Sequence, residues 1–101
     1  MEEIKVQNNK SLLRFEVSVK DELAFLTYRF YKNNLALMHT SVPASMKGKG
    51  MGTKLVIAAI DFAIEQNKKL MLYCSFAAKF VKEHKEFHQY VDTDFHPSLK
   101  G

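Results

Sequence analysis

Hydrophobic and polar residues alternate near the start of the chain with the two-residue period of a β-strand. Residues 12–20 read Leu-Leu-Arg-Phe-Glu-Val-Ser-Val-Lys, with apolar side chains at the odd positions from Leu13 to Val19 and polar side chains between them. Successive side chains of a strand point to opposite faces, so this pattern predicts a half-buried strand. A second run, Leu23 to Tyr31, is rich in aromatic residues and ends at the turn signal Lys32-Asn33-Asn34. Together the two runs predict a β-hairpin.

A third run, Leu35 to Val42, opens with four consecutive apolar residues and stops at Pro43. A strand that is covered on both faces has this composition, so we expect a central strand here. After a glycine-rich segment, residues 53–66 carry apolar side chains at helical spacing, with polar side chains on the opposite stripe. This spacing predicts an amphipathic helix of about four turns. The sequence Asn67-Lys68-Lys69 suits its end, because Asn tolerates a left-handed cap and cations complement the helix dipole.

Two shorter elements and a tail complete the chain. A buried strand is expected at Leu70 to Tyr73 and a second helix at Phe76 to His84, whereas Asp92 to Gly101 has the composition of a loosely held tail. The predicted fold is therefore α+β, with three antiparallel strands, a glycine loop, a helix, a parallel strand and a helix in one domain, residues 1–101. The third and fourth strands are joined through a helix, so they should be parallel with a right-handed crossover.

Composition narrows the class of protein. With 101 residues, of which 47% are hydrophobic, one compact core is expected rather than disorder. No apolar run is long enough to cross a bilayer, and the first residues, Met1-Glu2-Glu3-Ile4-Lys5, lack the basic and then apolar character of a signal peptide. We therefore expect a cytoplasmic protein without membrane contact. The single cysteine, Cys74, excludes an intramolecular disulfide and a cysteine-rich zinc site. The net charge of +4 favours anionic partners without selecting one.

The segment between the third strand and the first helix combines glycines with lysines. It reads Lys47-Gly48-Lys49-Gly50-Met51-Gly52-Thr53, with Lys54 next. Free backbone amides at a helix N-terminus form an anion site suited to a pyrophosphate, and the lysines would steer such a ligand toward it. Two other interpretations stay open at this point. The lysines can form a solvated face, and the glycines can serve only to shape a tight connection between strand and helix.

The spacing of these glycines does not fit two familiar nucleotide-binding loops. A Walker loop requires Gly, four residues and then Gly-Lys-Ser/Thr, but the position five residues after Gly48 is Thr53. A dinucleotide fingerprint requires Gly-x-Gly-x-x-Gly after the first strand of a parallel unit, whereas this chain has Gly-x-Gly-x-Gly after a hairpin. We therefore expect neither a P-loop nor a Rossmann site.

The loop carries a resemblance to a known family. Lys47-x-x-Gly50-x-Gly52 resembles the Arg/Gln-x-x-Gly-x-Gly/Ala acyl-CoA motif of the GNAT superfamily of N-acetyltransferases. His39-Thr40-x-Val42-Pro43, Ala58-Ala59-x-Asp61-Phe62 and Cys74-Ser75-Phe76 are similar, in the same order, to segments of the small YjdJ-type branch of that superfamily. The likeness runs from about residue 12 to residue 91. Four motifs in order are much more specific than one.

The resemblance implies a minimal GNAT-like fold with coenzyme A or acetyl-CoA as its cofactor. The backbone amides of Gly48 to Thr53 would hold the pyrophosphate, and the pantetheine would lie between the strand ending at Val42 and the strand Leu70 to Tyr73. Lys47 replaces the usual Arg or Gln, which keeps the charge and loses the bidentate fork. The superfamily's first two helices have no counterpart here, which implies an open acceptor side. The implied cofactor-binding residues are Thr40, Val42, Lys47, Gly48, Lys49, Gly50, Met51, Gly52, Thr53 and Cys74.

Cys74 and His39 are the candidates for catalysis. Acetyl transfer needs one group that takes a proton from the ammonium and another that protonates the departing thiolate. Cys74 ends a buried strand directly before a helix, and His39 lies on the central strand shortly before the loop. Each also has a structural interpretation, as a small buried side chain or as a hydrogen-bonded strand residue. The tyrosine that superfamily members use on the last helix is missing from the matching stretch, Phe80-Val81-Lys82-Glu83.

The expected function is the transfer of an acetyl group from acetyl-CoA to an unidentified amine, on a small molecule or a protein lysine. The alternative is a CoA-binding module without turnover. Nucleic-acid binding is less expected, because the chain lacks the Lys/Arg-Gly-Phe/Tyr-Gly/Ala-Phe element of RNA-binding sheets. No metal site is expected, because Lys85 stands where the zincin pattern of His84 and His88 would need Glu. A monomer or weak dimer is expected.

Overall fold

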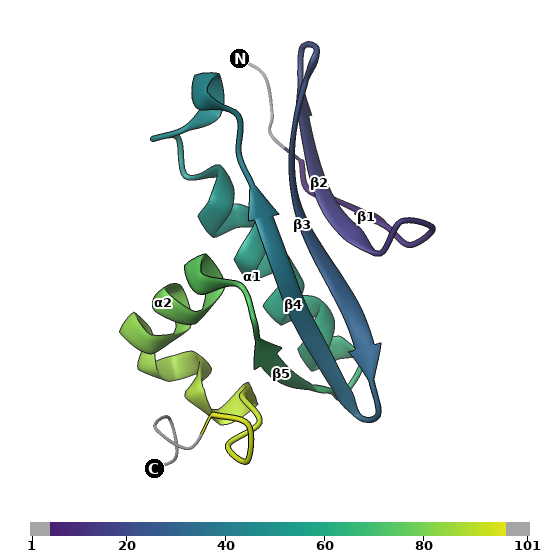
Figure 1. The fold of residues 1–101 in the computed structure, drawn as a ribbon, viewed down its shortest axis with the longest axis vertical. Helices are drawn as coiled ribbons and strands as arrows, with labels where there is room; N and C mark the ends of the chain where they lie inside the picture. The colour runs from purple at the N-terminus through teal and green to yellow at the C-terminus, as the bar shows by residue number, and fades with distance from the viewer. Residues whose placement is uncertain (1–4, 97–101) are drawn as a thin grey trace.

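A five-stranded sheet runs in sequence order through the computed structural model, which describes residues 5–96. Its strands are β1 (Gln7–Asn9), β2 (Arg14–Val19), β3 (Glu22–Tyr31), β4 (Asn34–Ser41) and β5 (Lys69–Leu72). The first four pair antiparallel with their neighbours, and β5 pairs parallel with β4 (Figure 1). The helical elements are η1 (Ala44–Met46), α1 (Met51–Glu65), α2 (Ser75–Glu83) and η2 (Lys85–Tyr90). The predicted α+β fold is confirmed. The strand predicted at Leu70 to Tyr73 is β5 and is parallel to β4, and β1 is an additional strand.

One face of the sheet is covered by α1, which lies behind the strands in Figure 1. The alternation in β2 buries Phe15 and Val17 against this helix side, together with the cross-strand partners Leu26 and Ala24. Each aliphatic side chain that is fully buried in this way contributes about 1.5–3 kcal/mol relative to an exposed one. Buried residues of α1 fill the other half of the core: Met51, Gly52, Leu55, Val56, Ala59, Ile60 and Ala63. No helix within residues 5–96 is long and apolar enough to span a membrane.

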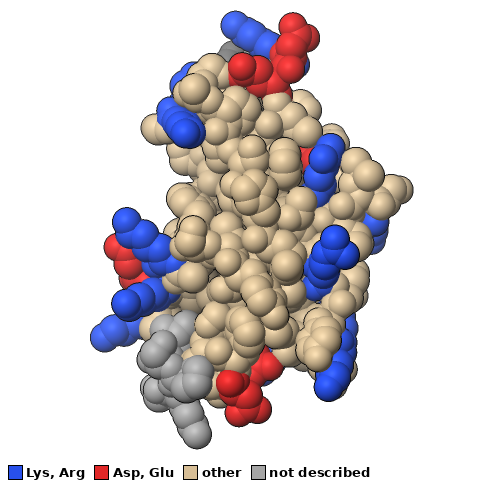
Figure 2. Space-filling model, viewed as in Figure 1, with Lys and Arg blue, Asp and Glu red and all other residues tan. Residues whose placement is uncertain are grey.

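The opposite face of the sheet is not covered by α1. Thr27 pairs with His39 on this face, one position along from the pair of buried Leu26 and partly buried Thr40. The guanidinium of Arg14 lies 5.1 Å from the centre of the Phe25 ring on the same face. Figure 2, which views the molecule from this side, shows a largely uncharged middle with Lys and Arg side chains toward the margins. Over β2 and β3 the sheet therefore has one packed face and one accessible face. Ala36 of β4 and its partner Met71 of β5 are buried on the second face, so the central strand is covered on both faces there, as its composition predicted.

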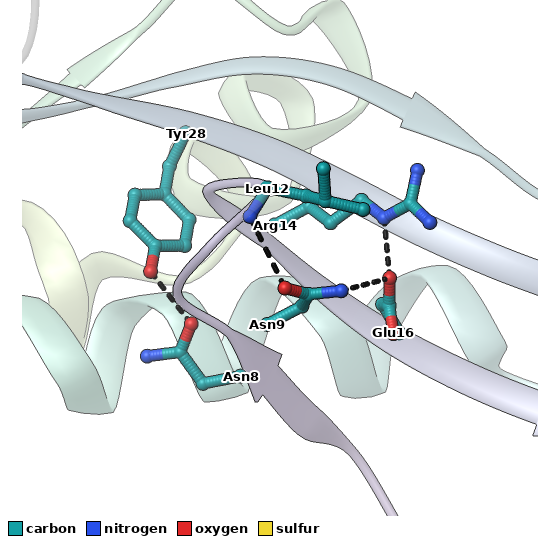
Figure 3. A network of polar contacts seen from close by, with 6 residues as sticks. All are labelled: Asn8, Asn9, Leu12, Arg14, Glu16 and Tyr28. Atoms are coloured by element: carbon teal, nitrogen blue, oxygen red, sulfur yellow. Dashed lines mark hydrogen bonds and ion pairs between the residues drawn. The ribbon is translucent and has the colours of Figure 1, made fainter.

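Polar side chains fix the short strand β1, which the hydrophobic pattern did not predict. The hydroxyl of Tyr28 donates a hydrogen bond to Oδ1 of Asn8 at 2.6 Å (Figure 3). Nδ2 of Asn9 donates to the carboxylate of Glu16 at 3.0 Å, and Arg14 forms an ion pair with the same carboxylate. The strand sequence Gln-Asn-Asn has no apolar residue, so its pairing rests on these contacts and on the backbone ladder.

The segment after η2 is attached to the sheet, so the prediction of a loose tail is wrong for residues 92–96. Val91 forms a parallel bridge with Leu70. The carboxylate of Asp92 accepts a hydrogen bond of 2.6 Å from the Asn34 side chain, and Nε2 of His96 accepts one of 2.8 Å from the backbone amide of Leu72. These partners are distant in sequence, which is why a local pattern did not reveal them. The remainder of the predicted tail, residues 97–101, lies outside the described residues.

Candidate functional site

The N-terminus of α1 presents free backbone amides. The first helical hydrogen bond, of 3.0 Å, runs from the amide of Lys54 to the carbonyl of Gly50, so the amides of Met51, Gly52 and Thr53 have no carbonyl within the helix. No side chain among the described residues caps this end, and its first turn contains no acidic residue. The positive end of the helix dipole is therefore neither capped nor neutralised, which suits an anion.

The helix begins earlier than the sequence predicted, at Met51 instead of Thr53, because Gly50 ends the loop in a left-handed conformation. Its φ is +75°, and Gly48 has φ +79°, a region that L-residues with a Cβ rarely adopt. These two glycines let the chain turn sharply from η1 into α1. Gly48 and Gly50 thus shape the tight connection between strand and helix, which was one of the interpretations left open by the sequence.

The third glycine has a different role, since Gly52 lies in the first turn of α1 against the side chain of Phe76. A Cβ at Gly52 would lie 2.7 Å from Cζ of Phe76, which is too close for any real contact. The missing side chain therefore allows the first turns of α1 and α2 to approach each other. The ring of Phe76 remains 43% exposed beside the free amides.

Three lysines surround this helix end. The side chains of Lys47, Lys49 and Lys54 are exposed, and none of them forms a salt bridge within the described part of the chain. Their charges remain available to an approaching anion, with the screening that applies to any exposed charge. The predicted loop residues therefore do come together around one helix end.

Strands β4 and β5 separate beside this loop. Their parallel pairing covers only Asn34 to Leu37 on β4, and the amides of Tyr73 and Cys74 then both donate to the carbonyl of Leu37, at 3.0 and 2.9 Å. Beyond that point β4 continues to Ser41, paired only with β3. The register of β3 and β4 shifts at Thr27 and Tyr28, which leaves Met38 as an extra residue in a β-bulge. Among residues 5–96, no strand lies beside the backbone edge of 38–41 on the β5 side.

The side chains of Thr40 and Cys74 meet across the separated strands. Oγ1 of Thr40 lies 3.0 Å from Sγ of Cys74, whose side chain is buried with 6% of its surface exposed. Val42, at the start of the loop, is partly buried against the same core. Three of the residues implied as cofactor-binding therefore lie along this split. The Thr40 contact itself carried no sequence signal beyond membership of the His39-Thr40 motif.

His39 points to the other face of the sheet. Its side chain is exposed, and its ring centre lies 6.3 Å from that of Phe25 on the uncovered face. Within the described residues, no hydrogen bond joins the imidazole to Cys74, which lies in the core on the α1 side. The two predicted catalytic residues thus lie on or directly after neighbouring strands, but on opposite faces of the sheet and without a hydrogen bond between them.

Helix α2 contains no tyrosine, so it presents no phenol to the split between β4 and β5. Val81 is buried, and the ring of Phe80 is stacked on that of His84 with the centres 4.1 Å apart. The phenol adjacent to Cys74 is that of Tyr73, which is 52% exposed and packs 4.9 Å from the Phe95 ring. Sequence reasoning treated it only as a strand residue, although its position directly before Cys74 was a usable signal.

The histidine pair at the end of α2 binds backbone groups. Nδ1 of His84 lies 2.6 Å from the carbonyl of Phe80, and Nε2 of His88 lies 2.9 Å from that of Val81. No cluster of three or more His, Cys, Asp or Glu side chains that would hold a metal ion occurs in the part of the chain that the structure describes. These histidines have a structural role at the end of the helix.

Comparison with known proteins decides the family. The family model described as GCN5-related N-acetyl-transferase matches residues 14–91, which include the split, the glycine loop and both helices. The chain belongs to this GNAT family. The assignment rests on most of the domain, from β2 to the end of η2.

The GNAT chain is also similar to individual proteins. It is 34% identical to Protein NATD1 of Xenopus tropicalis over 83 residues, which covers 79% of this chain and 76% of that protein. It is 31% identical to Protein NATD1 of Danio rerio over 96 residues, with 92% and 86% covered. The solution NMR structure of a GCN5-like candidate N-acetyltransferase from Staphylococcus aureus matches with a TM-score of 0.72 at 27% identity, over 91% of each chain. The GNAT fold is thereby confirmed, whereas the YjdJ-type branch stays a prediction.

Proposed function

We propose that this GNAT domain binds acetyl-CoA and transfers its acetyl group to an amine. The observation that carries the proposal is the uncapped N-terminus of α1, where the amides of Met51, Gly52 and Thr53 precede the first helical hydrogen bond. Members of the family in general use acetyl-CoA, and a helix end of this kind suits the pyrophosphate of that cofactor.

The neighbouring residues fit the remainder of the cofactor. A pantetheine chain carries amide groups, and the unpaired strand edge of 38–41 offers backbone donors and acceptors for them. A chain that enters between β4 and β5 would reach the Thr40 and Cys74 side chains, which touch across that gap. The exposed Lys47 and Lys49 would attract the phosphates from outside.

The two candidate catalytic residues, His39 and Cys74, would then act from opposite faces of the sheet. When bound, acetyl-CoA supplies the acetyl group as a thioester, which the amine attacks with release of the CoA thiol. In this proposal His39, on the uncovered face, would take the proton from an ammonium that approaches from that side. Cys74, in contact with Thr40 at the split, would give a proton to the departing sulfur. The largely uncharged face in Figure 2 would let an acceptor reach His39.

Calorimetric titration with CoA and acetyl-CoA tests the binding step, in the native chain and in two variants of Gly50. Both Gly50→Glu and Gly50→Ala place a side chain at φ +75° in open space, so they share the same backbone strain. Only the carboxylate of Gly50→Glu repels a pyrophosphate. We expect micromolar binding to the native chain, a small loss in Gly50→Ala and a loss of about a hundredfold in Gly50→Glu. Absence of binding at millimolar CoA would refute the proposal and favour a nucleic-acid or protein partner.

A CoA-binding module without turnover is the second candidate, and the lack of a tyrosine on α2 favours it. Steady-state acetylation of a panel of amines separates the two, with Cys74→Ala and His39→Asn as variants in which the enzyme hypothesis expects turnover to fall. If the native chain binds acetyl-CoA but acetylates no amine faster than the solution reaction, the binding module is the correct description.

A further inference from the structure

A groove lies at the start of β5, away from the glycine loop and from the split between β4 and β5. It has a volume of about 550 Å³, within the usual range for small-molecule sites, and its lining includes Lys69, Lys85, His88, Gln89 and Asp92. Lys69 is the first residue of β5, whereas the split opens at the other end of that strand. Figure 1 shows η2 and the segment after it at the lower end of the molecule, and the glycine loop at the upper end. We call this hollow the β5–η2 groove.

Two lysines bring positive charge to the β5–η2 groove without an acidic partner. Nζ of Lys69 donates a hydrogen bond of 2.7 Å to the carbonyl of Gln89, which holds the ammonium in place and leaves its other hydrogens for a ligand. The side chain of Lys85 is exposed. Between residues 5 and 96 the only ion pair joins Arg14 to Glu16, so neither lysine of the groove is neutralised by a carboxylate.

The one acidic side chain of the groove is satisfied by other groups. Oδ2 of Asp92 accepts a hydrogen bond of 2.6 Å from Asn34, and Oδ1 accepts bonds of 2.9 and 3.3 Å from the backbone amides of Asp94 and Phe95. The next acidic residue, Asp94, does not line the groove. Two ammonium groups therefore face one carboxylate whose oxygens are already in use, and the groove carries a net positive charge.

We propose that the β5–η2 groove binds a phosphate group, either free or carried by a small organic molecule. A phosphate is largely a dianion at neutral pH, so it matches two ammonium groups in charge, and its oxygens accept several charge-assisted hydrogen bonds. Lys69 and Lys85 would contact these oxygens, and the hydroxyl of Thr93 is a further donor in the lining. The groove is larger than a phosphate group requires, which leaves space for an organic part beside it.

A phosphate in this groove would connect β5 to the segment that covers its outer edge. The amide of Asp92 donates a hydrogen bond of 2.9 Å to the carbonyl of Leu70, and Val91 forms a parallel bridge with the same residue. A phosphate shared by Lys69 of β5 and Lys85 of η2 would add a further link between the two. Because a ligand of the folded state stabilises it, phosphate would secure the strand that leads to Cys74.

Titration of the isotope-labelled native chain with inorganic phosphate, followed by two-dimensional ¹H–¹⁵N NMR at low salt and pH 7.5, tests this site. We expect the amides of residues 88–93 to shift in one saturable process with a Kd of about 1 mM. Lys69→Gln and Lys85→Gln should each weaken this binding about tenfold, because each removes a charge-assisted contact. Lys82→Gln is the matched control, since Lys82 is exposed on α2 and does not line the groove, and it should leave the affinity unchanged.

Two further ligands define the chemistry of the site. Acetate, a monoanion, should bind at least about tenfold more weakly than phosphate, and an equal affinity would overturn the assignment to a phosphate group. Glycerol 3-phosphate should shift the same amides as inorganic phosphate. Tighter binding of glycerol 3-phosphate supports a phosphate monoester as the ligand, and tighter binding of inorganic phosphate supports the free anion.

The positions of the shifted amides separate this inference from the proposed function. Phosphate also suits the free amides of Met51 to Thr53, which lie at the other end of the molecule. Shifts confined to those amides, or no shifts up to about 50 mM phosphate, would overturn the β5–η2 site and leave CoA binding untouched. Equal effects of Lys85→Gln and Lys82→Gln would reveal a response to net charge alone and would also overturn it. If Lys69→Gln disturbs the chain at its contact with Gln89, Lys85→Gln still decides, because Lys85 is exposed and forms no salt bridge within residues 5–96.

Discussion

At the scale of single residues, Tyr28 shows how a polar group is accommodated in the core. Its side chain is only 1% exposed, and its ring packs 5.2 Å from that of Phe15 and 5.6 Å from that of Phe62. Burial raises the pKa of the phenol, and the hydrogen bond to Asn8 acts in the opposite direction. The hydroxyl therefore stays protonated and donates to Oδ1 of Asn8, which fastens β1 to the sheet.

The change Tyr28→Phe should destabilise the fold without changing its packing. It removes the donor and leaves Oδ1 of Asn8 without its partner, at a cost of about 1 kcal/mol. In a domain of this size that corresponds to a fall in Tm of roughly 4–8 °C, measurable by circular dichroism. Tyr31→Phe is the control, because Tyr31 is 54% exposed and has no such bond. Similar melting of the two variants would contradict the assigned role of the Asn8 bond.

At the scale of elements, the contact between α1 and α2 depends on the absence of a side chain. Gly52 lies within the helix and not at a left-handed position, so alanine there would be favoured by helix propensity, by about 1 kcal/mol. The nearest obstacle to its methyl group is the tip of the Phe76 ring, which is partly exposed and can swing away. Helix propensity therefore favours alanine at position 52, whereas the Phe76 ring in its present position favours glycine.

We expect Gly52→Ala to keep its stability within about 1 kcal/mol of the native chain while it weakens CoA binding. The methyl group displaces the Phe76 ring from beside the free amides, so the loss should be about tenfold. Urea denaturation and calorimetry on the same preparation measure the two effects. Ala58→Gly, in the middle of α1 and away from the loop, should show the reverse, with lower stability and unchanged affinity. Unchanged CoA affinity in Gly52→Ala would mean that the ring does not act in binding.

The elements that sequence patterns predicted are those with a local cause. The alternation from Leu13 to Val19 located β2, and the helical spacing located α1, because both patterns record burial against one neighbour. The bulge at Met38, the contact of Thr40 with Cys74 and the attachment of His96 escaped prediction, since each depends on a partner far away in sequence. The site was therefore predictable as a loop and a strand end, and its side-chain pairing was not.

At the scale of the whole molecule, several titratable groups favour the folded state at neutral pH. A hydrogen bond from Asn34 holds the pKa of Asp92 below its usual value, and one from Arg14 does the same for Glu16. Burial lowers the pKa of His96, which the Asp92 carboxylate partly offsets. The imidazole must also be neutral at Nε2 to accept the hydrogen bond from Leu72.

Acidification should therefore lower the free energy of unfolding in two stages. Below the ordinary histidine pKa of 6.5, unfolded His96 takes up a proton before folded His96 does, so stability falls with pH in that window. The carboxylate contribution is present above the usual pKa of Asp and Glu, and it is lost as the pH falls through their lower folded values. Urea midpoints at pH 7.5 and 5.5 should differ less in His96→Gln, whose amide oxygen accepts the same bond without titrating. Equal differences in both proteins would exclude His96 as a source of the pH dependence.

The order of the strands along the sheet also bears on how the chain assembles. Each of the first four strands meets its partner through a short hairpin connection, so those pairs close quickly and at little entropic cost. The pairing of β4 with β5 closes a longer loop, because all of α1 lies between the two strands in sequence. This join consists of four residue pairs. We therefore expect the folding chain to complete this join last, and the candidate site lies along it. We expect this seam to be where the native domain opens most readily, and where an inserted cofactor would complete the sheet.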